Sequence, residues 1–247
     1  MAGRNGILTA LPTALLFLLL LTGCSQLGVF NAVIPHDRGS MLVARDVGYG
    51  PLDRQKLDVY APASDARADG VIVFFYGGSW NSGRKEDYAF AAKALATRGY
   101  VTIVFDYRLV PAIRYPAFVE DGAKAVAWAH RNAGKYGGDT DRLFVLGHSA
   151  GAYNAMMVTL APEFLTAEGL SPAVIRAGAG LSGPYDFLPL DVDAAREAFR
   201  GVADLDNTQP VNRVRRDQAV PPLFLATGDA DDVVMPRNTK ALASTLR

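Results

Sequence analysis

Cysteine, histidine and net charge are all scarce in this chain of 247 residues, which has 1 cysteine and 3 histidines. A single cysteine excludes an intramolecular disulfide framework, a CxxC redox motif and a thiolate-rich zinc site. The 25 basic residues balance the 25 acidic ones, so there is no electrostatic reason to expect nucleic acid as a partner. Three histidines suffice for one catalytic imidazole, provided that it lies in the right place.

Long apolar runs are also rare, and the longest one, residues 7–21, follows the positive charge of Arg4. At about 15 residues, interrupted by Pro12, this run is short for a membrane span and typical of a secretory signal. It ends in Leu-Thr-Gly-Cys at Cys24. That pattern resembles the bacterial lipobox, in which the cysteine is lipidated and becomes the mature N-terminus.

We therefore predict a signal peptide over residues 1–23, a lipidated N-terminus and tether over residues 24–42, and lipid attachment at Cys24. The lipid would anchor the protein to a membrane, because each buried methylene contributes about 0.8 kcal/mol. By resemblance to bacterial lipoproteins, Ser25 favours the outer membrane, facing the periplasm. The alternatives are a plain signal peptide and an N-terminal anchor that is never cleaved.

The rest of the chain alternates short apolar segments with helical patterns. Continuous β-branched and aromatic runs are typical of strands buried on both faces of a parallel sheet. Such strands are predicted at residues 71–75, 101–105, 143–146, 174–181 and 222–226, after an opening hairpin at 43–49 and 56–60. Helices are predicted at residues 87–98, 118–132, 150–160 and 237–246, and residues 191–211 form either a small cap or a surface excursion. The alternation predicts one α/β domain with a mostly parallel sheet over residues 43–247.

A G-x-S-x-G pattern, residues 147–151 (GHSAG), lies directly between a predicted strand and a predicted helix. In that context the central residue, Ser149, sits on a tight turn that pushes its Oγ clear of the sheet, where it can act as a nucleophile. Gly147 and Gly151 let strand and helix approach each other. The positive end of the following helix also favours negative charge at this position.

The second glycine-rich turn, residues 76–80 (YGGSW), follows the first buried strand. Adjacent glycines expose backbone N–H groups, which a developing oxyanion requires. We predict that the N–H groups of Gly77, Gly78 and Ala150 form an oxyanion hole beside Ser149.

In these two motifs the sequence resembles the α/β-hydrolase superfamily, in particular the carboxylesterase and hormone-sensitive-lipase-like branch with an HGGxW oxyanion loop. The resemblance covers about residues 43–247, and further matches are 105–109 (FDYRL), 115–117 (YPA) before Asp121, and 137–139 (GGD). It implies an α/β-hydrolase fold. Tyr76 departs from the pattern, which usually has histidine there, and we expect it to preserve the loop with altered hydrogen bonding. Asp106 and Asp121 are expected to order local structure.

The acid of a catalytic triad should follow a late strand. By resemblance to the family pattern G-x-x-D-x-x-V-P, the segment 228–236 (GDADDVVMP) places it at Asp231. Its role would be to orient the catalytic histidine and stabilise the imidazolium. Asp229 and Asp232 are alternatives, as is an acidic loop that water merely solvates.

No histidine follows Asp231, although the fold requires the order Ser, Asp, His. His148 lies within the elbow, His130 is expected to be a satisfied surface residue, and His36 lies in the predicted tether. By resemblance, the chain stops before the final strand and the loop that carries the base. We therefore expect a C-terminally incomplete domain; a natural truncation that retains only a binding cleft and a different base are the alternatives.

Taken together, the residues predict a serine carboxylesterase that hydrolyses small carboxylic esters through an acyl-enzyme on Ser149, without metal or organic cofactor. Two other functions stay open. One is an arylformamidase-like amidase or a peptidase with the same machinery. The other is a catalytically inactive envelope-binding protein. The sequence does not indicate an oligomeric state.

Overall fold

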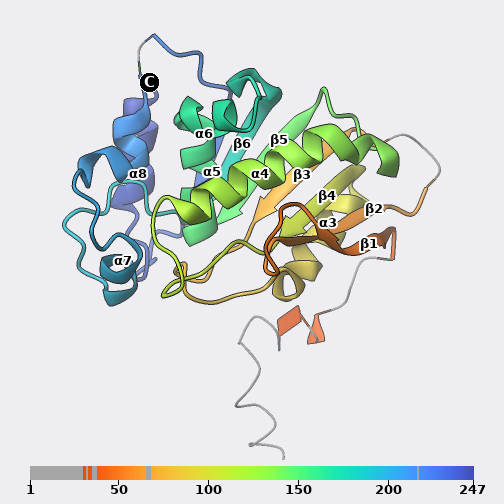
Figure 1. Cartoon of the computed structure of the whole chain (residues 1–247), viewed down its shortest axis with the longest axis horizontal. Coiled ribbons are helices and arrows are strands. Elements are labelled where there is room, and N and C mark those ends of the chain that lie inside the picture. Colours follow the sequence, from red (N-terminus) through yellow and green to blue (C-terminus); the bar gives the residue numbers. More distant parts are fainter. Residues whose placement is uncertain (1–29, 32, 35–37, 65–67, 216) are drawn as a thin grey trace, which may run out of the picture.

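The computed structural model describes residues 30–31, 33–34, 38–64, 68–215 and 217–247. The predicted signal peptide, Cys24 and His36 lie outside this part of the chain. Within it, seven strands form one sheet in the order β1-β2-β4-β3-β5-β6-β7 (Figure 1). The strands are β1 (Ser40–Gly48), β2 (Lys56–Pro62), β3 (Gly70–Phe75), β4 (Tyr100–Phe105), β5 (Leu143–His148), β6 (Ile175–Leu181) and β7 (Leu223–Ala226).

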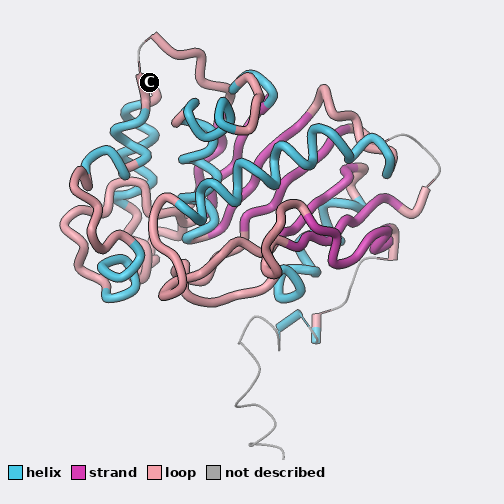
Figure 2. The backbone as a smooth tube through the Cα atoms, in the orientation of Figure 1, coloured by secondary structure: helices cyan, strands magenta, loops and turns pink. Residues whose placement is uncertain are grey.

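The sheet is antiparallel at one edge and parallel elsewhere. β1 pairs with β2 and β2 with β4 in antiparallel fashion, whereas β4, β3, β5, β6 and β7 are parallel to one another. The carboxyl ends of the parallel strands therefore meet at one edge of the sheet. Figure 2 shows loop segments gathered at that edge, next to α7. The predicted α/β class and mostly parallel sheet are confirmed.

Helices cover both faces of the sheet. The α-helices are α3 (Ala89–Thr97), α4 (Ala117–Asn132), α5 (Ala150–Leu160), α6 (Pro162–Ala167), α7 (Asp193–Ala198) and α8 (Arg237–Thr245). Because side chains alternate along a strand, neighbouring residues of β3 face different layers. A Cβ on Gly122 of α4 would stand 2.6 Å from the Phe75 ring, whereas Phe74 packs against Tyr88 at 5.4 Å between ring centroids.

Short 3₁₀ helices change two predicted boundaries. The predicted helix over residues 87–98 is a 3₁₀ turn, η1 (Lys85–Tyr88), followed by α3, and the predicted strand over 174–181 begins after η3 (Pro172–Val174). The other 3₁₀ helices are η2 (Ala133–Tyr136), η4 (Asp206–Thr208) and η5 (Pro210–Arg213). The break in the first helix allows Lys85 and Tyr88 to point into the protein, where both are almost fully buried.

The ordered domain begins before residue 43. β1 starts at Ser40, and part of the predicted tether contacts α3. The Asn31 side chain accepts a hydrogen bond from the Phe90 backbone N–H at 2.9 Å and donates to the Glu86 carbonyl at 3.2 Å. The Phe30 and Phe90 rings meet edge to face at 5.1 Å.

β7 forms the edge of the sheet in the described part of the chain. The edge is apolar, and Phe224 in its middle is 64% exposed. A surface cavity of about 290 Å³ runs across the sheet beside it, bordered by Phe144, Leu146 and Phe224.

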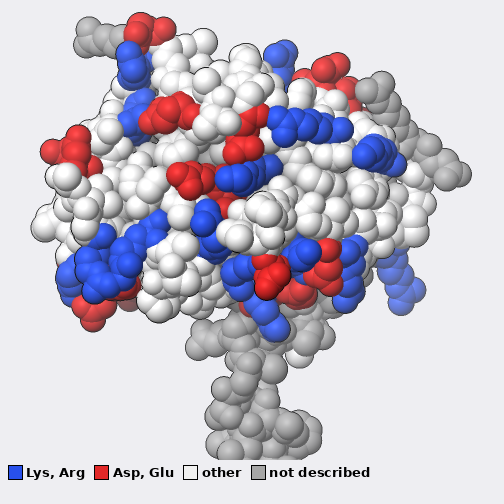
Figure 3. Space-filling view, in the orientation of Figure 1, with Lys and Arg blue, Asp and Glu red and all other residues white. Residues whose placement is uncertain are grey.

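Charged side chains of both signs are interspersed over the face seen in Figure 3. Many of them are paired, including Arg114 with Glu197 at 2.5 Å and Lys124 with Glu168 at 3.7 Å. Each helix in the described part of the chain is too short or too polar to cross a membrane.

Candidate active site

Ser149 occupies a strained turn between β5 and α5. Its φ of 54° and ψ of −126° are rare for a residue with a side chain, and such strain is retained where surrounding structure enforces it. Here its N–H donates to the Leu181 carbonyl at 2.9 Å. Ser149 is half-buried and lies at the first position before a helix whose residues are all buried.

The glycines that flank Ser149 are required by close backbone contacts. A Cβ on Gly151 would stand 2.1 Å from the Phe75 carbonyl oxygen, and one on Gly147 would stand 2.4 Å from the Gly151 carbonyl oxygen. Both obstacles are backbone atoms, which cannot move aside without shifting a strand or a helix. The elbow therefore packs directly against the end of β3 and the loop that follows it.

That loop, residues 76–80, is the predicted oxyanion loop, and its backbone is unusual. Gly78 has φ +141°, and the next two residues, Ser79 and Trp80, have φ of +50° and +59°. A Cβ on Gly77 would stand only 2.9 Å from Cβ of Ser149, so the loop and the elbow touch. Consecutive left-handed residues turn successive peptide groups of the loop, a conformation that can leave backbone N–H groups free to bind an anion.

One of the three predicted oxyanion donors is already occupied. The Gly77 N–H donates to the Tyr88 hydroxyl at 3.2 Å, so it is not free to bind an oxyanion in this conformation. Among the described residues, the N–H groups of Gly78, Ser79 and Ala150 have no acceptor. Ser79 was not predicted as a donor, although its place in a run of three small residues was a usable signal.

Tyr76 stands where the family pattern usually has histidine, and it anchors the start of the loop. Its hydroxyl donates to Asp106 Oδ1 at 3.0 Å and accepts from the Arg54 guanidinium at 3.0 Å. The Tyr107 hydroxyl donates to the Tyr76 carbonyl at 3.0 Å. Burial raises the pKa of Tyr76 well above its ordinary value, so the phenol stays protonated. Hydrogen bonds from the Tyr76 hydroxyl and to its carbonyl thus hold the start of the loop in place.

Trp80 ends the loop inside an aromatic cluster. Its indole Nε1–H donates to Asn154 Oδ1 of α5 at 3.1 Å, and its ring stacks on Phe118 at 5.7 Å and Phe187 at 6.1 Å. Trp80 is 4% exposed, as expected for a residue packed beneath the loop. The other tryptophan, Trp128 of α4, is half-buried, stacks on Tyr136 and packs against the hydrophobic core.

Asp231 lies in the loop between β7 and α8, at the same edge of the sheet. Its Oδ1 accepts hydrogen bonds from the backbone N–H groups of Val234 at 2.9 Å and Val233 at 3.1 Å. The Val234 bond is the largest cause of a lowered pKa for this carboxyl, with help from the Ser182 hydroxyl and His148. The loop is therefore built around an ionised carboxylate at Asp231. The two alternative residues, Asp229 and Asp232, are exposed.

Neither described histidine is placed as a base for Ser149. The His148 Nδ1 is hydrogen-bonded to the Tyr88 hydroxyl at 3.0 Å, and burial lowers the pKa of this imidazole. His130 lies on α4 and borders a separate surface cavity with Thr140 and Arg176. Its Nδ1 is buried without a hydrogen-bond partner among the described residues, so the expectation that it is fully satisfied was wrong.

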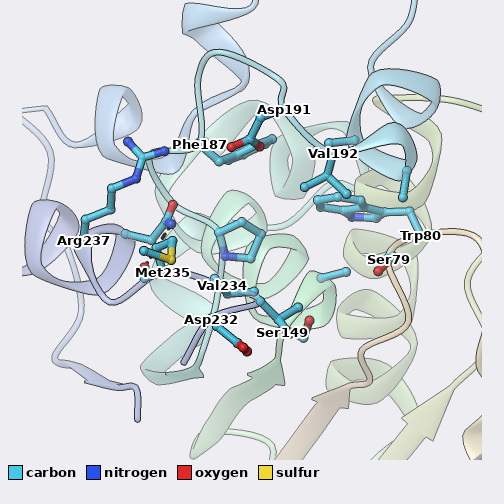
Figure 4. Close-up of a pocket in the computed structure, with 16 residues that line it drawn as sticks. Ser79, Trp80, Ser149, Phe187, Asp191, Val192, Asp232, Val234, Met235 and Arg237 are labelled. Carbon is cyan, nitrogen blue, oxygen red and sulfur yellow. Dashed lines mark hydrogen bonds between the residues drawn. The ribbon is translucent and has the colours of Figure 1, made fainter. Parts of the chain in front are cut away.

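A cavity of about 290 Å³ opens beside Ser149 (Figure 4). Ser149 lies at its base, with Ser79 and Trp80 on one side and Met235 and Arg237 on the other. The wall consists mainly of apolar residues from the loop after β6, from α7 and from the loop before α8: Pro184, Phe187, Val192, Ala194, Ala195, Val233, Val234 and Met235. The predicted cap region, residues 191–211, therefore contributes to the cavity.

The sheet, the elbow and the adjoining cavity define an α/β-hydrolase fold. Esterase B from Lactobacillus rhamnosis, in an inhibited form, superposes with a TM-score of 0.78 at 20% identity, covering 95% of this chain and 80% of that one. Apo esterase 2 from Thermogutta terrifontis gives 0.68 at 24% identity, covering 86% and 80%. The family model described as BD-FAE matches residues 57–246, and the chain belongs to this family.

Named relatives are esterases. The probable isoprenylcysteine alpha-carbonyl methylesterase ICMEL1 of Oryza sativa subsp. japonica is 31% identical over 84% of this chain and 54% of its own length. Esterase LipC of Mycobacterium tuberculosis is 28% identical over 82% of this chain and 55% of its own length. The chain thus spans about half the length of the curated relatives it matches.

Proposed function

We propose that this protein is a serine carboxylesterase that hydrolyses small carboxylic esters. The observation that carries the proposal is the position of Ser149, which is strained at the start of α5 and shares a cavity with Ser79 of the glycine-rich loop and with Ala150. Within the described chain, the N–H groups of Gly78, Ser79 and Ala150 have no acceptor. The protein also belongs to the BD-FAE family and has relatives named as esterases, which supports the same reaction.

In the proposed reaction, Ser149 Oγ attacks the ester carbonyl carbon and its proton passes to a general base. The bond between the carbonyl carbon and the alkoxy oxygen then breaks, and the alcohol leaves with that proton. Water hydrolyses the resulting acyl-enzyme to the acid and free Ser149. The oxyanion is held by Ala150, Gly78 and Ser79, because the Gly77 N–H is occupied. Each such donor is worth about 2.7–4 kcal/mol of transition-state stabilisation.

The proposal assigns Asp231 to orient a histidine that the described residues do not supply. His148 is engaged by Tyr88 and His130 borders another cavity. We propose that the base belongs to further sequence of the full-length protein, a view supported by the greater length of the relatives. Reading the gene beyond codon 247 tests this directly. A histidine after one more strand pattern supports the proposal, and a stop codon at position 248 contradicts it.

The size of the cavity favours an ester whose acyl or alcohol group is small. Its volume of about 290 Å³ lies at the lower end of the range for small-molecule sites, and its walls are largely apolar. We therefore expect acetate and butyrate esters to be better substrates than esters of long fatty acids.

The decisive assay is turnover of p-nitrophenyl acetate and p-nitrophenyl butyrate by the full-length protein. Ser149→Ala should abolish turnover, whereas Ser171→Ala, a surface serine that caps η3, should not. A parallel assay with an aryl formamide separates the amidase alternative. Turnover that survives Ser149→Ala would overturn the nucleophile assignment, and inactivity of the full-length protein toward every ester would favour a binding protein.

We also propose that lipid on Cys24 anchors the protein to the outer membrane, facing the periplasm. The support is the sequence pattern at residues 21–24. In a bacterial host, metabolic labelling with an alkyne-tagged fatty acid should mark the wild-type protein and not Cys24→Ser. Equal labelling of both proteins would contradict the anchor.

A further inference from the structure

The hydroxyl of Tyr88 lies between the oxyanion loop and the elbow. It is 3.2 Å from the Gly77 backbone nitrogen and 3.0 Å from His148 Nδ1. The residue is 3% exposed, and its ring packs on Tyr76 at 5.9 Å and Phe74 at 5.4 Å between centroids. These two polar groups are the hydroxyl's hydrogen-bond partners within the described chain.

Counting hydrogens fixes the direction of both bonds. A backbone N–H can only donate, so the Tyr88 oxygen accepts from Gly77. The hydroxyl then has one hydrogen left to donate, and His148 Nδ1 is the acceptor within reach. An imidazole nitrogen that accepts carries no hydrogen, so His148 is neutral with its hydrogen on Nε2. In this arrangement the Gly77 N–H, the Tyr88 hydroxyl and His148 Nδ1 each have a hydrogen-bond partner.

We propose that Tyr88 is a positioning residue of this site, which ties the oxyanion loop at Gly77 to the elbow and holds His148 as its neutral Nε2–H tautomer. The bond to Tyr88 turns the Gly77 N–H away from the substrate. The same bond holds the loop at Gly77, and so limits how far the N–H groups of Gly78 and Ser79, which follow it in the chain, can move. The assignment of a positioning role rests on the proposed esterase function; the tautomer does not.

Protonation of His148 would break this arrangement. Nδ1 would become a donor facing a hydroxyl that already accepts from Gly77, and the Tyr88 hydrogen would have no acceptor in a buried site. The charged groups that face this pair are Asp231, from the loop before α8, and Asp87, next to Tyr88 on η1. Asp231 favours the imidazolium, but burial outweighs it, so the pKa of His148 is lowered.

The experiment is a nitrogen-15 NMR titration of the three histidines in the full-length protein, in the absence of substrate. The signals of His148 are those that disappear in His148→Gln. We expect Nδ1 without hydrogen and Nε2 with hydrogen at neutral pH. Tyr88→Phe removes one donor to the neutral ring, so the pKa of His148 should rise by about 0.5–1 unit, a three- to tenfold change in the protonation equilibrium.

The matched control is Tyr107→Phe, which removes another buried hydroxyl that holds the loop, at the Tyr76 carbonyl, without touching His148. It should leave the tautomer and pKa of His148 unchanged. A second readout is amide exchange of Gly77, which should accelerate in Tyr88→Phe. If Tyr88→Phe fails to fold, the tautomer of His148 in the wild-type protein, measured by nitrogen-15 NMR, still tests the proposal.

Two results would overturn the proposal: hydrogen on Nδ1 of His148 in the wild-type protein, or equal pKa values in wild type and Tyr88→Phe. Neither outcome depends on turnover, so failure of this inference and failure of the esterase proposal are distinguishable. If the full-length protein is active, Tyr88→Phe should lower kcat while KM stays within about twofold, because the oxyanion forms only in the transition state.

Discussion

The hydroxyl of Tyr76 donates a 3.0 Å hydrogen bond to Oδ1 of Asp106, and both groups lie beneath the predicted oxyanion loop. The same carboxylate oxygen accepts the Lys85 backbone N–H at 2.8 Å. Burial raises the pKa of Asp106, and the hydrogen bonds from Lys85 and Tyr76 counter this effect. Tyr76 and Lys85 therefore give the buried carboxylate of Asp106 two hydrogen-bond donors.

Tyr76→Phe should lower the free energy of unfolding by about 1–2 kcal/mol, because Asp106 and the Arg54 guanidinium each lose a buried partner. Denaturant unfolding measures this change. The control Tyr100→Phe removes a hydroxyl that has no hydrogen bond among the described residues, and it should change the stability by less than about 0.5 kcal/mol. Equal effects of the two substitutions would contradict the role assigned to Tyr76.

Gly151→Ala should be one of the most damaging single-methyl additions in the chain. The new Cβ would stand 2.1 Å from the Phe75 carbonyl oxygen and 2.3 Å from that of Tyr76, so the strand or the helix must shift. We expect a loss of about 3 kcal/mol or more. Gly134→Ala, where a Cβ meets nothing within 4 Å, should be neutral or slightly stabilising. The melting temperatures of the two variants, measured by thermal unfolding, check this difference. Similar melting temperatures would contradict the close packing of Gly151 against the end of β3.

Lys85→Met should destabilise the fold by about 3–5 kcal/mol. The side chain of Lys85 is 1% exposed and its ammonium pairs with Asp58 at 3.1 Å, Asp46 at 2.7 Å and Glu86. Because the Asp58 side chain is only 3% exposed, removing the ammonium leaves a buried carboxylate without its counter-charge. Arg215→Met, which removes an exposed ion pair to Asp217, should cost less than about 1 kcal/mol in the same denaturant titration.

Asp231→Asn should make the protein less stable at neutral pH but not in acid. The folded state lowers the pKa of Asp231, chiefly through the Val234 N–H, so ionised Asp231 stabilises the fold above its unfolded pKa of about 3.9. That contribution is lost as the pH falls through the lowered folded value. Denaturant unfolding at pH 7 and near pH 2 should show the difference from wild type shrinking. Asp229→Asn serves as the exposed control, and a constant difference for Asp231→Asn would contradict the carboxylate-centred loop.

The sequence was most informative where its signals were local. Continuous apolar runs predicted the parallel strands, and residues 147–151 predicted the turn at Ser149, because strand, turn and helix are neighbours in the chain. The antiparallel opening hairpin is likewise confirmed. The assignments of Ser149, Asp231 and the oxyanion donors stay predictions, although their residues lie at one edge of the sheet.

Contacts between residues far apart in the sequence could not be predicted from its motifs and hydrophobic pattern. Nothing in the sequence indicates that Tyr88 meets His148, 60 positions away, or that the occupied N–H in the loop is that of Gly77. The same holds for the cavity wall, where Val192 and Met235 come from separate loops. Such contacts depend on how the helices pack, which hydrophobic periodicity does not specify.

Arg54, in the turn between β1 and β2, reaches the oxyanion loop from outside the parallel core. Its guanidinium donates to the Tyr107 carbonyl at 2.7 Å, the Gly83 carbonyl at 2.7 Å and the Tyr76 hydroxyl at 3.0 Å. The family match begins at residue 57, after this arginine. A domain boundary drawn from family similarity would therefore cut away a support of the oxyanion loop. A shortened chain that keeps this support must start before Arg54 and so retain the turn between β1 and β2.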